Sequence, residues 1–262
     1  MDEFLPQILN NLSQIFDHSF STSNYVMMEA ILDSISSIAA INAFTEYYSR
    51  FMPALKNIVS MVISDTPQKI SVKGKAIETM GDLLASIRDA PEFESECQTI
   101  MSSLLMLQQQ IDREDTLNRA IFNVYENVVD VLKERFAVYS DFIFERAMEA
   151  ARRNSSVQII DEIDTQKQTK NPNMHKFVKL KLDLKIDGIK NLVLNTDTFE
   201  QKLEASNLLS CMARSMGTPF LKYRDSMIAT IQELILYKSS KDIRSNMIES
   251  SKYLVINGAT SQ

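Results

Sequence analysis

Few residues of this 262-residue chain have side chains that perform chemistry on their own. The two histidines, His18 and His175, are far apart and have no nearby Cys, Asp or Glu at the spacing of metal ligands. Cys97 and Cys211 fall on predicted apolar helix faces and suggest neither a disulfide framework nor a metal site. The 5 glycines are scattered, so no phosphate-binding loop is expected, and no pair of carboxylates is placed for acid–base catalysis. We therefore expect no catalytic, cofactor-binding or metal-binding residues and no enzyme activity.

The composition predicts an all-α protein with cationic partners. With only 5 Gly, 6 Pro and no Trp, the chain has few turn signals and favours helix. A net charge of −6 and an isoelectric point near 5.1 disfavour nucleic-acid binding and favour positively charged partners. No apolar run reaches the roughly 18 residues that span a membrane, and the N-terminus lacks the pattern of a signal peptide. We expect a cytosolic or nuclear protein without membrane insertion.

Two amphipathic segments between Ser23 and Val62 must position any binding surface. Apolar residues recur at three- and four-residue spacings in both, which places them on one face of each helix. The short connection predicts an antiparallel hairpin of two helices.

The hairpin recurs about every 45 residues, within the 40–47 residue period of HEAT and armadillo repeats. One hairpin cannot bury both of its faces, so we expect the repeats to stack into an α–α superhelix, a HEAT-repeat solenoid. Aromatic and methionine stripes at this spacing are expected in the core. The first helices align on the small residues Ala30, Ala76, Ala120, Ala205 and Ser250. The second helices open with the pairs Phe44 and Tyr47, Phe136 and Tyr139, and Phe220 and Tyr223.

The repeat boundaries follow from these stripes. Residues 178–186 alternate apolar and polar side chains, as a half-buried strand does, but we expect an extended linker because a single strand has no sheet to join. A short helix is expected to begin near Asp187. Both terminal helices carry apolar stripes, which predicts a slice of a longer array. The predicted units are a half repeat at 3–18, repeats at about 23–62, 69–110, 113–153 and 197–237, a half repeat at 242–257, and the linker at 154–185.

The stretch EAILDSISSIAAINAFTEYYSRFMPALKNIV resembles the importin-β (karyopherin-β) superfamily, through Tyr47–Tyr48 and Met52–Pro53 in particular. The segments KGKAIETMGDLLASI and FVKLKLDLKIDGIKN follow in the order typical of the karyopherin β3 branch. The likeness extends over most of residues 12–257 and resembles the middle of such a receptor.

This resemblance implies a fragment of a nuclear transport receptor that binds cargo proteins through basic localisation signals and carries them through the nuclear pore. It implies nucleoporin repeats and Ran GTPase as partners of the full-length protein, and a location in cytoplasm and nucleus. A HEAT-repeat scaffold that assembles a signalling enzyme complex is the alternative. In the family the second helices line the concave surface, and the residues that this face would present here for cargo binding are Asn11, Glu46, Arg50, Asn57, Asp141, Glu145, Glu149 and Asp225.

Overall fold

The computed structural model describes residues 4–39, 47–61, 66–113, 115–153, 157–161, 177–184 and 188–260. None of the helices in these ranges is both long and apolar enough to cross a membrane. In chain order the α-helices are α1 (Leu5–Ser21), α2 (Tyr25–Ala39), α3 (Tyr48–Ser60), α4 (Pro67–Ser86), α5 (Phe93–Gln110), α6 (Leu117–Leu132), α7 (Ser140–Arg152), α9 (Thr196–Ser215), α10 (Arg224–Leu234) and α11 (Lys241–Thr260). Two 3-10 helices, η2 (Lys133–Val138) and η4 (Thr218–Tyr223), precede α7 and α10.

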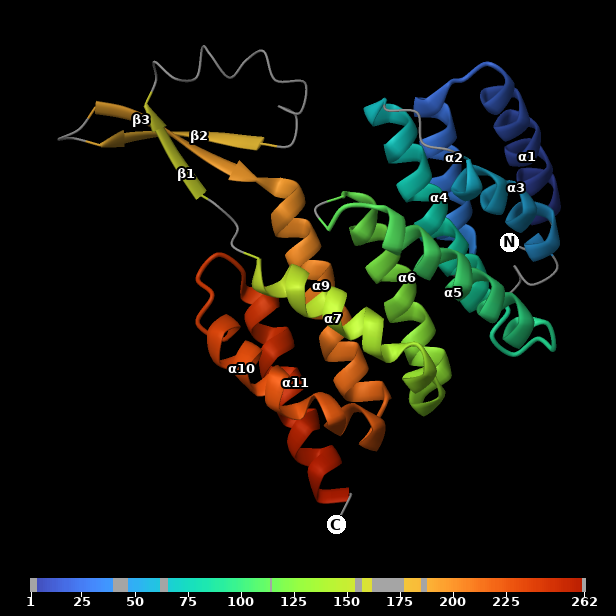
Figure 1. Cartoon of the computed structure of the whole chain (residues 1–262). Helices are drawn as coiled ribbons and strands as arrows, with labels where there is room; N and C mark the ends of the chain where they lie inside the picture. The colour runs from blue at the N-terminus through green and yellow to red at the C-terminus, as the bar shows by residue number, and fades with distance from the viewer. Residues whose placement is uncertain are drawn as a thin grey trace.

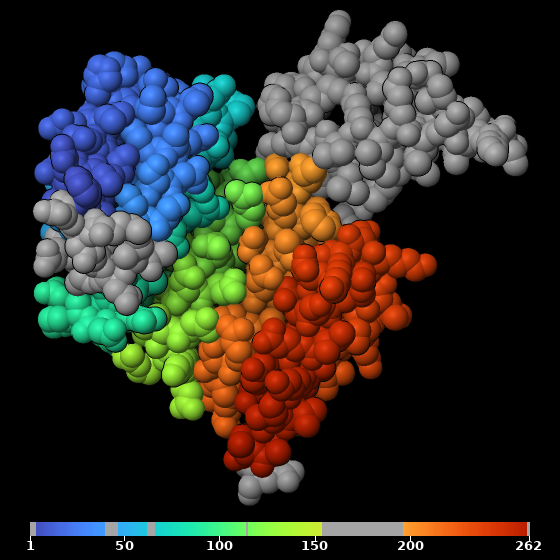
Figure 2. Space-filling model, turned by 180° about the vertical axis from the view of Figure 1, so that it is seen from behind, coloured from blue at the N-terminus to red at the C-terminus, as the bar shows by residue number. Residues whose placement is uncertain are grey.

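The helices form a stack of antiparallel hairpins (Figure 1). The first helices of successive hairpins pack on one another, α2 on α4, α4 on α6, α6 on α9 and α9 on α11. The second helices α3, α5, α7 and α10 follow on one side of this row. Seen from behind, the colours run from blue to red across the surface in chain order (Figure 2). The predicted HEAT-repeat solenoid is confirmed.

Small residues lie at the close contacts between first helices, with one exception. Ala76, Ala120, Ala205 and Ser250 are buried, whereas Ala30 is exposed. In α2 the buried face includes Met28, Ile31, Leu32, Ile35 and Ala39, so the predicted alignment of this helix on Ala30 was wrong. Apolar residues occupy adjacent positions in α2, so its sequence allows two apolar faces that differ by a rotation of about one residue. Packing on α4 decides which of the two is buried.

The aromatic pairs lie in the 3-10 turns that lead into second helices. Phe136 and Tyr139 have ring centroids 6.0 Å apart, and Phe220 and Tyr223 have centroids 5.7 Å apart. Tyr223 also stacks on Phe144 of α7, with centroids 4.0 Å apart. The pair therefore joins one second helix to the next. Phe44, from the first predicted pair, lies outside the described residues.

A three-stranded antiparallel sheet replaces the predicted linker and short helix. Its strands are β1 (Val157–Asp161), β2 (Phe177–Leu184) and β3 (Gly188–Asn195), in the order β1–β3–β2. Val178 pairs with Leu194, and Leu184 with Gly188. The prediction failed because it found no strand to pair with the alternating segment, which is β2. The partner is β3, the next segment of the chain, which pairs with β2 on one edge and with β1 on the other. Residues 154–156, 162–176 and 185–187 of this region lie outside the described ranges.

The carboxyl end of each second helix from α3 onward, or the turn that follows it, is hydrogen-bonded by a side chain of the first helix that comes next in the chain. Lys73 of α4 donates to the carbonyl of Met61 after α3 at 3.0 Å, and Lys202 of α9 donates to the carbonyl of Arg153 after α7 at 3.1 Å. Both lysines are buried, and burial lowers the pKa of each. Asn118 of α6 and Arg244 of α11 bond the carbonyls of the turns after α5 and α10 in the same way. Lys73 and Lys202 thus give donors to the carbonyls that follow α3 and α7, and Asn118 and Arg244 add donors to carbonyls of the next turns.

Candidate functional site

Three of the predicted cargo-binding residues form a row on α7. Asp141, Glu145 and Glu149 follow one another at intervals of four residues, which places them on one face of the helix over successive turns. We call this set the α7 carboxylate row. The row is the densest group of predicted site residues that the structure brings together.

The row borders a groove between α5 and α7. The groove encloses about 1010 Å³, and Phe142 and Ile111 supply apolar side chains to it. Two arginines also line it, but Arg146 donates to the carbonyl of Gln108 at 2.9 Å, and burial lowers the pKa of its guanidinium. The full lining comprises Gln108, Gln109, Ile111, Asp112, Arg113, Phe142, Glu145, Arg146 and Glu149.

A cation from the turn between α5 and α6 occupies one end of the row. Arg113, in the turn between α5 and α6, lies 2.5 Å from the carboxylate of Glu149. The hydrogen bond to Glu149 raises the pKa of the Arg113 guanidinium above its ordinary value. The arginine side chain is 66% exposed, so solvent can reach this pair and screens it.

A cation from the following repeat occupies the other end. Lys222 of η4 lies 2.6 Å from Asp141, and the hydroxyl of Tyr223 donates to the same carboxylate oxygen at 2.6 Å. The Lys222 ammonium also lies 4.8 Å from the centre of the Tyr223 ring. The hydrogen bonds from Lys222 and then Tyr223 lower the pKa of Asp141.

The middle of the row is open. Glu145 is exposed, and among the described residues no cation lies within ion-pair distance of its carboxylate. A positively charged partner would therefore find a carboxylate here that forms no ion pair with the described side chains, although the charge of Arg113 attracts it from a longer distance.

The other predicted site residues lie apart from the row. Asn11 of α1 is exposed near Arg50 of α3, whose guanidinium bonds the side chain of the adjacent Asn10. Asn57 is exposed on α3, and Asp225 at the start of α10 pairs with its neighbour Arg224 at 3.2 Å. Glu46 lies outside the described residues.

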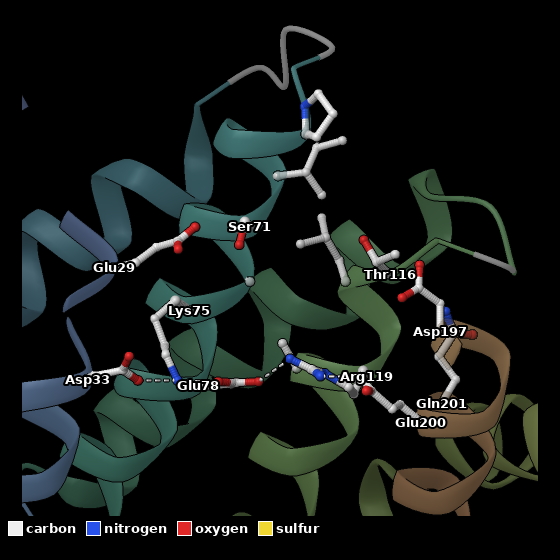
Figure 3. Close-up of a pocket in the computed structure, with 15 residues that line it drawn as sticks. Glu29, Asp33, Ser71, Lys75, Glu78, Thr116, Arg119, Asp197, Glu200 and Gln201 are labelled. Atoms are coloured by element: carbon white, nitrogen blue, oxygen red, sulfur yellow. Dashed lines mark hydrogen bonds and ion pairs between the residues drawn. The ribbon is translucent and has the colours of Figure 1, made fainter. Parts of the chain in front are cut away.

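A second group of charges links first helices around a hollow of about 370 Å³ (Figure 3). Lys75 of α4 contacts Asp33 of α2 at 2.5 Å and Glu78 at 3.0 Å, and Arg119 of α6 contacts Glu78 at 3.4 Å and Glu200 of α9 at 2.5 Å. We call these five residues the first-helix ladder. It ties four successive hairpins together.

Glu126 of α6 is a partly buried carboxylate near the ladder that forms no ion pair with any residue in the described ranges. Burial, followed by repulsion from Glu204 and Asp130, raises the pKa of Glu126 on α6 to about 7. Cys211 of α9 donates to Asp130 at 3.1 Å and is buried. This cluster lies where α6, α9 and α11 meet.

Sequence analysis missed the two cations that contact the row. Arg113 lies in a turn and Lys222 in a 3-10 helix, so neither belongs to the helix stripes that defined the predicted face. A signal was available: Arg113 lies in the turn that joins the preceding repeat to α6, Lys222 lies in the following repeat, and a stacked array places neighbouring repeats in contact.

Comparison with known proteins identifies both a sequence relative and structural relatives. Importin subunit beta-3 of Saccharomyces cerevisiae is 24% identical over 226 residues, which are 85% of this chain and 19% of the relative. The predicted resemblance to the importin-β superfamily is confirmed. No family model matches the chain.

Solved structures of the karyopherin Kap121p share the fold of the whole array. Kap121p bound to Pho4p superposes with a TM-score of 0.69 at 18% identity, over 98% of this chain and 24% of that one. Kap121p bound to RanGTP gives a TM-score of 0.65 at 19% identity, again over 98% and 24% of the two chains. Kap121p bound to Nup53p gives 0.67 at 18% identity, over 98% and 23%. The chain thus spans about a fifth to a quarter of the length of these importin-β relatives.

Proposed function

We propose that the chain is a segment of a nuclear transport receptor and that the α7 carboxylate row binds basic localisation signals of cargo proteins. The observation that carries the proposal is the open carboxylate of Glu145 between Asp141 and Glu149, beside the groove that α5 and α7 form. The importin-β likeness supports it, since Kap121p has been solved with the proteins Pho4p and Ste12p bound. The net charge of −6 favours the approach of a basic segment.

The spacing of the row defines the peptide that fits it. Four residues of α-helix rise about 6 Å, and two residues of an extended chain rise about 6.6 Å. Lysines at alternate positions of an extended peptide that runs along α7 therefore match Asp141, Glu145 and Glu149 in order. The expected signal contains the pattern Lys-x-Lys-x-Lys.

Several weak contacts must act together in this binding. An exposed ion pair contributes roughly 0.2–1 kcal/mol, so one lysine on one carboxylate gives little affinity. We propose that the remaining positions of the predicted set extend the contact along the second helices. These positions are Asn11, Glu46, Arg50, Asn57 and Asp225.

For the whole protein we propose Ran GTPase and nucleoporins as further partners, and passage between cytoplasm and nucleus. Solved relatives bound to RanGTP and to Nup53p support this. The proposal concerns the full receptor, since this chain corresponds to about a quarter of those relatives.

Fluorescence anisotropy with a labelled Lys-x-Lys-x-Lys peptide tests the assignment to α7. We expect E145K to weaken binding at least about tenfold at low salt, because it replaces the open carboxylate by a repelling ammonium. Added salt should weaken wild-type binding, since the contacts are exposed. A peptide with the same lysines placed consecutively should bind less tightly.

The matched control is D89K, which makes the same change of charge at a carboxylate that is 95% exposed outside the groove. Equal losses for E145K and D89K would show that only net charge matters and would contradict a site on α7. Absence of salt-sensitive peptide binding would contradict the transport assignment and favour the scaffold alternative.

A further inference from the structure

We propose that Arg113 and Lys222 are resident cations that hold the two ends of the α7 carboxylate row, so that a basic partner binds the row by displacing them. This inference rests on the proposed function of the row and adds two residues that set its affinity. Arg113 comes from the turn between α5 and α6 and Lys222 from the repeat after α7, so the two ends of the row are paired with cations of the chain itself.

The Arg113 end is positioned by the backbone around it. Arg153 at the end of α7 donates to the carbonyl of Arg113 at 2.8 Å, and Arg146 donates to the carbonyls of Gln108 and Ile111. These bonds fix the turn against α7. The Arg113 guanidinium alone reaches outward to Glu149, where it stands in the place that a partner's cation would take.

The Lys222 end contains the features of a lysine-binding site. The ammonium is held by the carboxylate of Asp141 and lies over the ring of Tyr223, which in turn stacks on Phe144. A carboxylate combined with an aromatic face is a favourable setting for a lysine from any source. An incoming lysine gains these contacts only when Lys222 leaves.

The ion pairs and solvent exposure of the row's side chains indicate the order in which a partner's lysines bind. Glu145 is the one carboxylate of the row with no described cation, so a partner's first lysine is expected there. The exposed side chains of Arg113 and Lys222 can then move into solvent, because each pair is screened and weak. The resident cations thus raise the number of lysines a signal needs before it binds.

The experiment compares peptide affinity in R113A and K222M, with the Lys-x-Lys-x-Lys peptide. Removal of either cation should tighten binding about twofold to fivefold at low salt, and the double variant should tighten it further. R88A is the control, since it removes one positive charge from a pair that lies outside the groove. It should tighten binding less than R113A does.

Repeating the R113A measurement in an E149Q variant separates displacement of Arg113 from the effect of removing any positive charge. In E149Q the gain from R113A should be smaller than in wild type, because Arg113 then has no hydrogen-bonded carboxylate to release and attracts only Glu145 from a longer distance. An equal gain in E149Q and wild type would overturn the inference. Unchanged or weaker binding in R113A and K222M would also overturn it, even where E145K abolishes binding and the proposed function stands. Failure of the proposed function is distinct, since E145K and D89K would then behave alike.

Discussion

Two groups of charges connect neighbouring repeats, and they are built differently. In the first-helix ladder, Lys75 and Arg119 each contact two carboxylates, so positive and negative groups alternate without a gap. In the α7 carboxylate row, each cation contacts one carboxylate of the row and Glu145 has no described ion-pair partner. The charges of the ladder are largely paired within the chain, while the row keeps one carboxylate that forms no ion pair with the described residues.

The two groups of charges also differ in their exposure to solvent. Glu78, at the centre of the ladder, has a side chain that is only 20% exposed, whereas the Asp141 side chain is 79% exposed. Ion pairs with less solvent contact are screened less, so the ladder contributes to repeat stacking more than the row does.

The largest expected effect comes from the packing beneath the ladder. A Cβ at Gly81 of α4 would lie 2.8 Å from Val124 Cγ2 and 3.3 Å from its Cα, so G81V should lower the free energy of unfolding by about 3 kcal/mol. At Gly74 the nearest atom is Leu117 Cδ2 at 3.6 Å, so G74A should instead raise stability by up to about 1 kcal/mol. Urea denaturation measures both, and similar losses in the two variants would show that α4 and α6 do not approach as described.

The next effect tests the ladder itself. R119M removes the cation between Glu78 and Glu200 but keeps an apolar stem, and should cost about 1 kcal/mol because two partly exposed ion pairs are lost. R113M, the matched change at the row, should leave the unfolding midpoint unchanged. A larger loss in R113M than in R119M would reverse the assigned roles of the two groups.

A smaller effect, dependent on pH, is expected at Glu126. Its pKa, raised from 4.5 to about 7, means that the folded chain binds this proton more tightly than the unfolded chain does. The charged form therefore destabilises the fold above about pH 7, and this penalty disappears as the pH falls toward 4.5. E126Q should raise stability at pH 8 by about 1 kcal/mol, a figure reduced for partial solvent exposure, and by little at pH 5. Thermal melts at both pH values check this; an equal gain at pH 5 would show a packing effect.

The smallest effect concerns the link between α7 and η4. Y223F removes the hydroxyl that donates to Asp141 but keeps the ring on Phe144, so the melting temperature should fall by only about 1–2 °C. The pKa of Asp141 should rise yet remain below its ordinary value, because Lys222 stays in place. NMR titration of the carboxyl measures this, and an unchanged pKa would show that the tyrosine does not contribute.

Much of the fold was predictable because helical spacing is a local property. The apolar stripes and the recurrence near 45 residues located the hairpins without knowledge of their contacts. The sheet was not predictable in this way, since β2 depends on pairing with β3 and β3 on its own sequence resembles a helix start. The phase of α2 depended on packing against α4, which the sequence of α2 alone does not contain.

The candidate site was predictable in part for a similar reason. The four-residue spacing of Asp141, Glu145 and Glu149 is visible within one helix. Arg113 reaches that helix from the turn between α5 and α6 and Lys222 from the following repeat, so their contacts require the folded structure. The sequence indicated where the carboxylates lie, but not which of them the chain itself neutralises.

The side chains that close the second helices have a consequence for dividing the array. Lys73, Lys202, Asn118 and Arg244 each belong to the hairpin after the helix end or turn that they bind. A hairpin cut out by itself would therefore lose these side-chain hydrogen bonds at its end. The smallest self-contained module is therefore a hairpin together with the next first helix. Shortened versions of this protein should end after a first helix such as α4, α6 or α9, and a cut directly after a second helix should leave a frayed end.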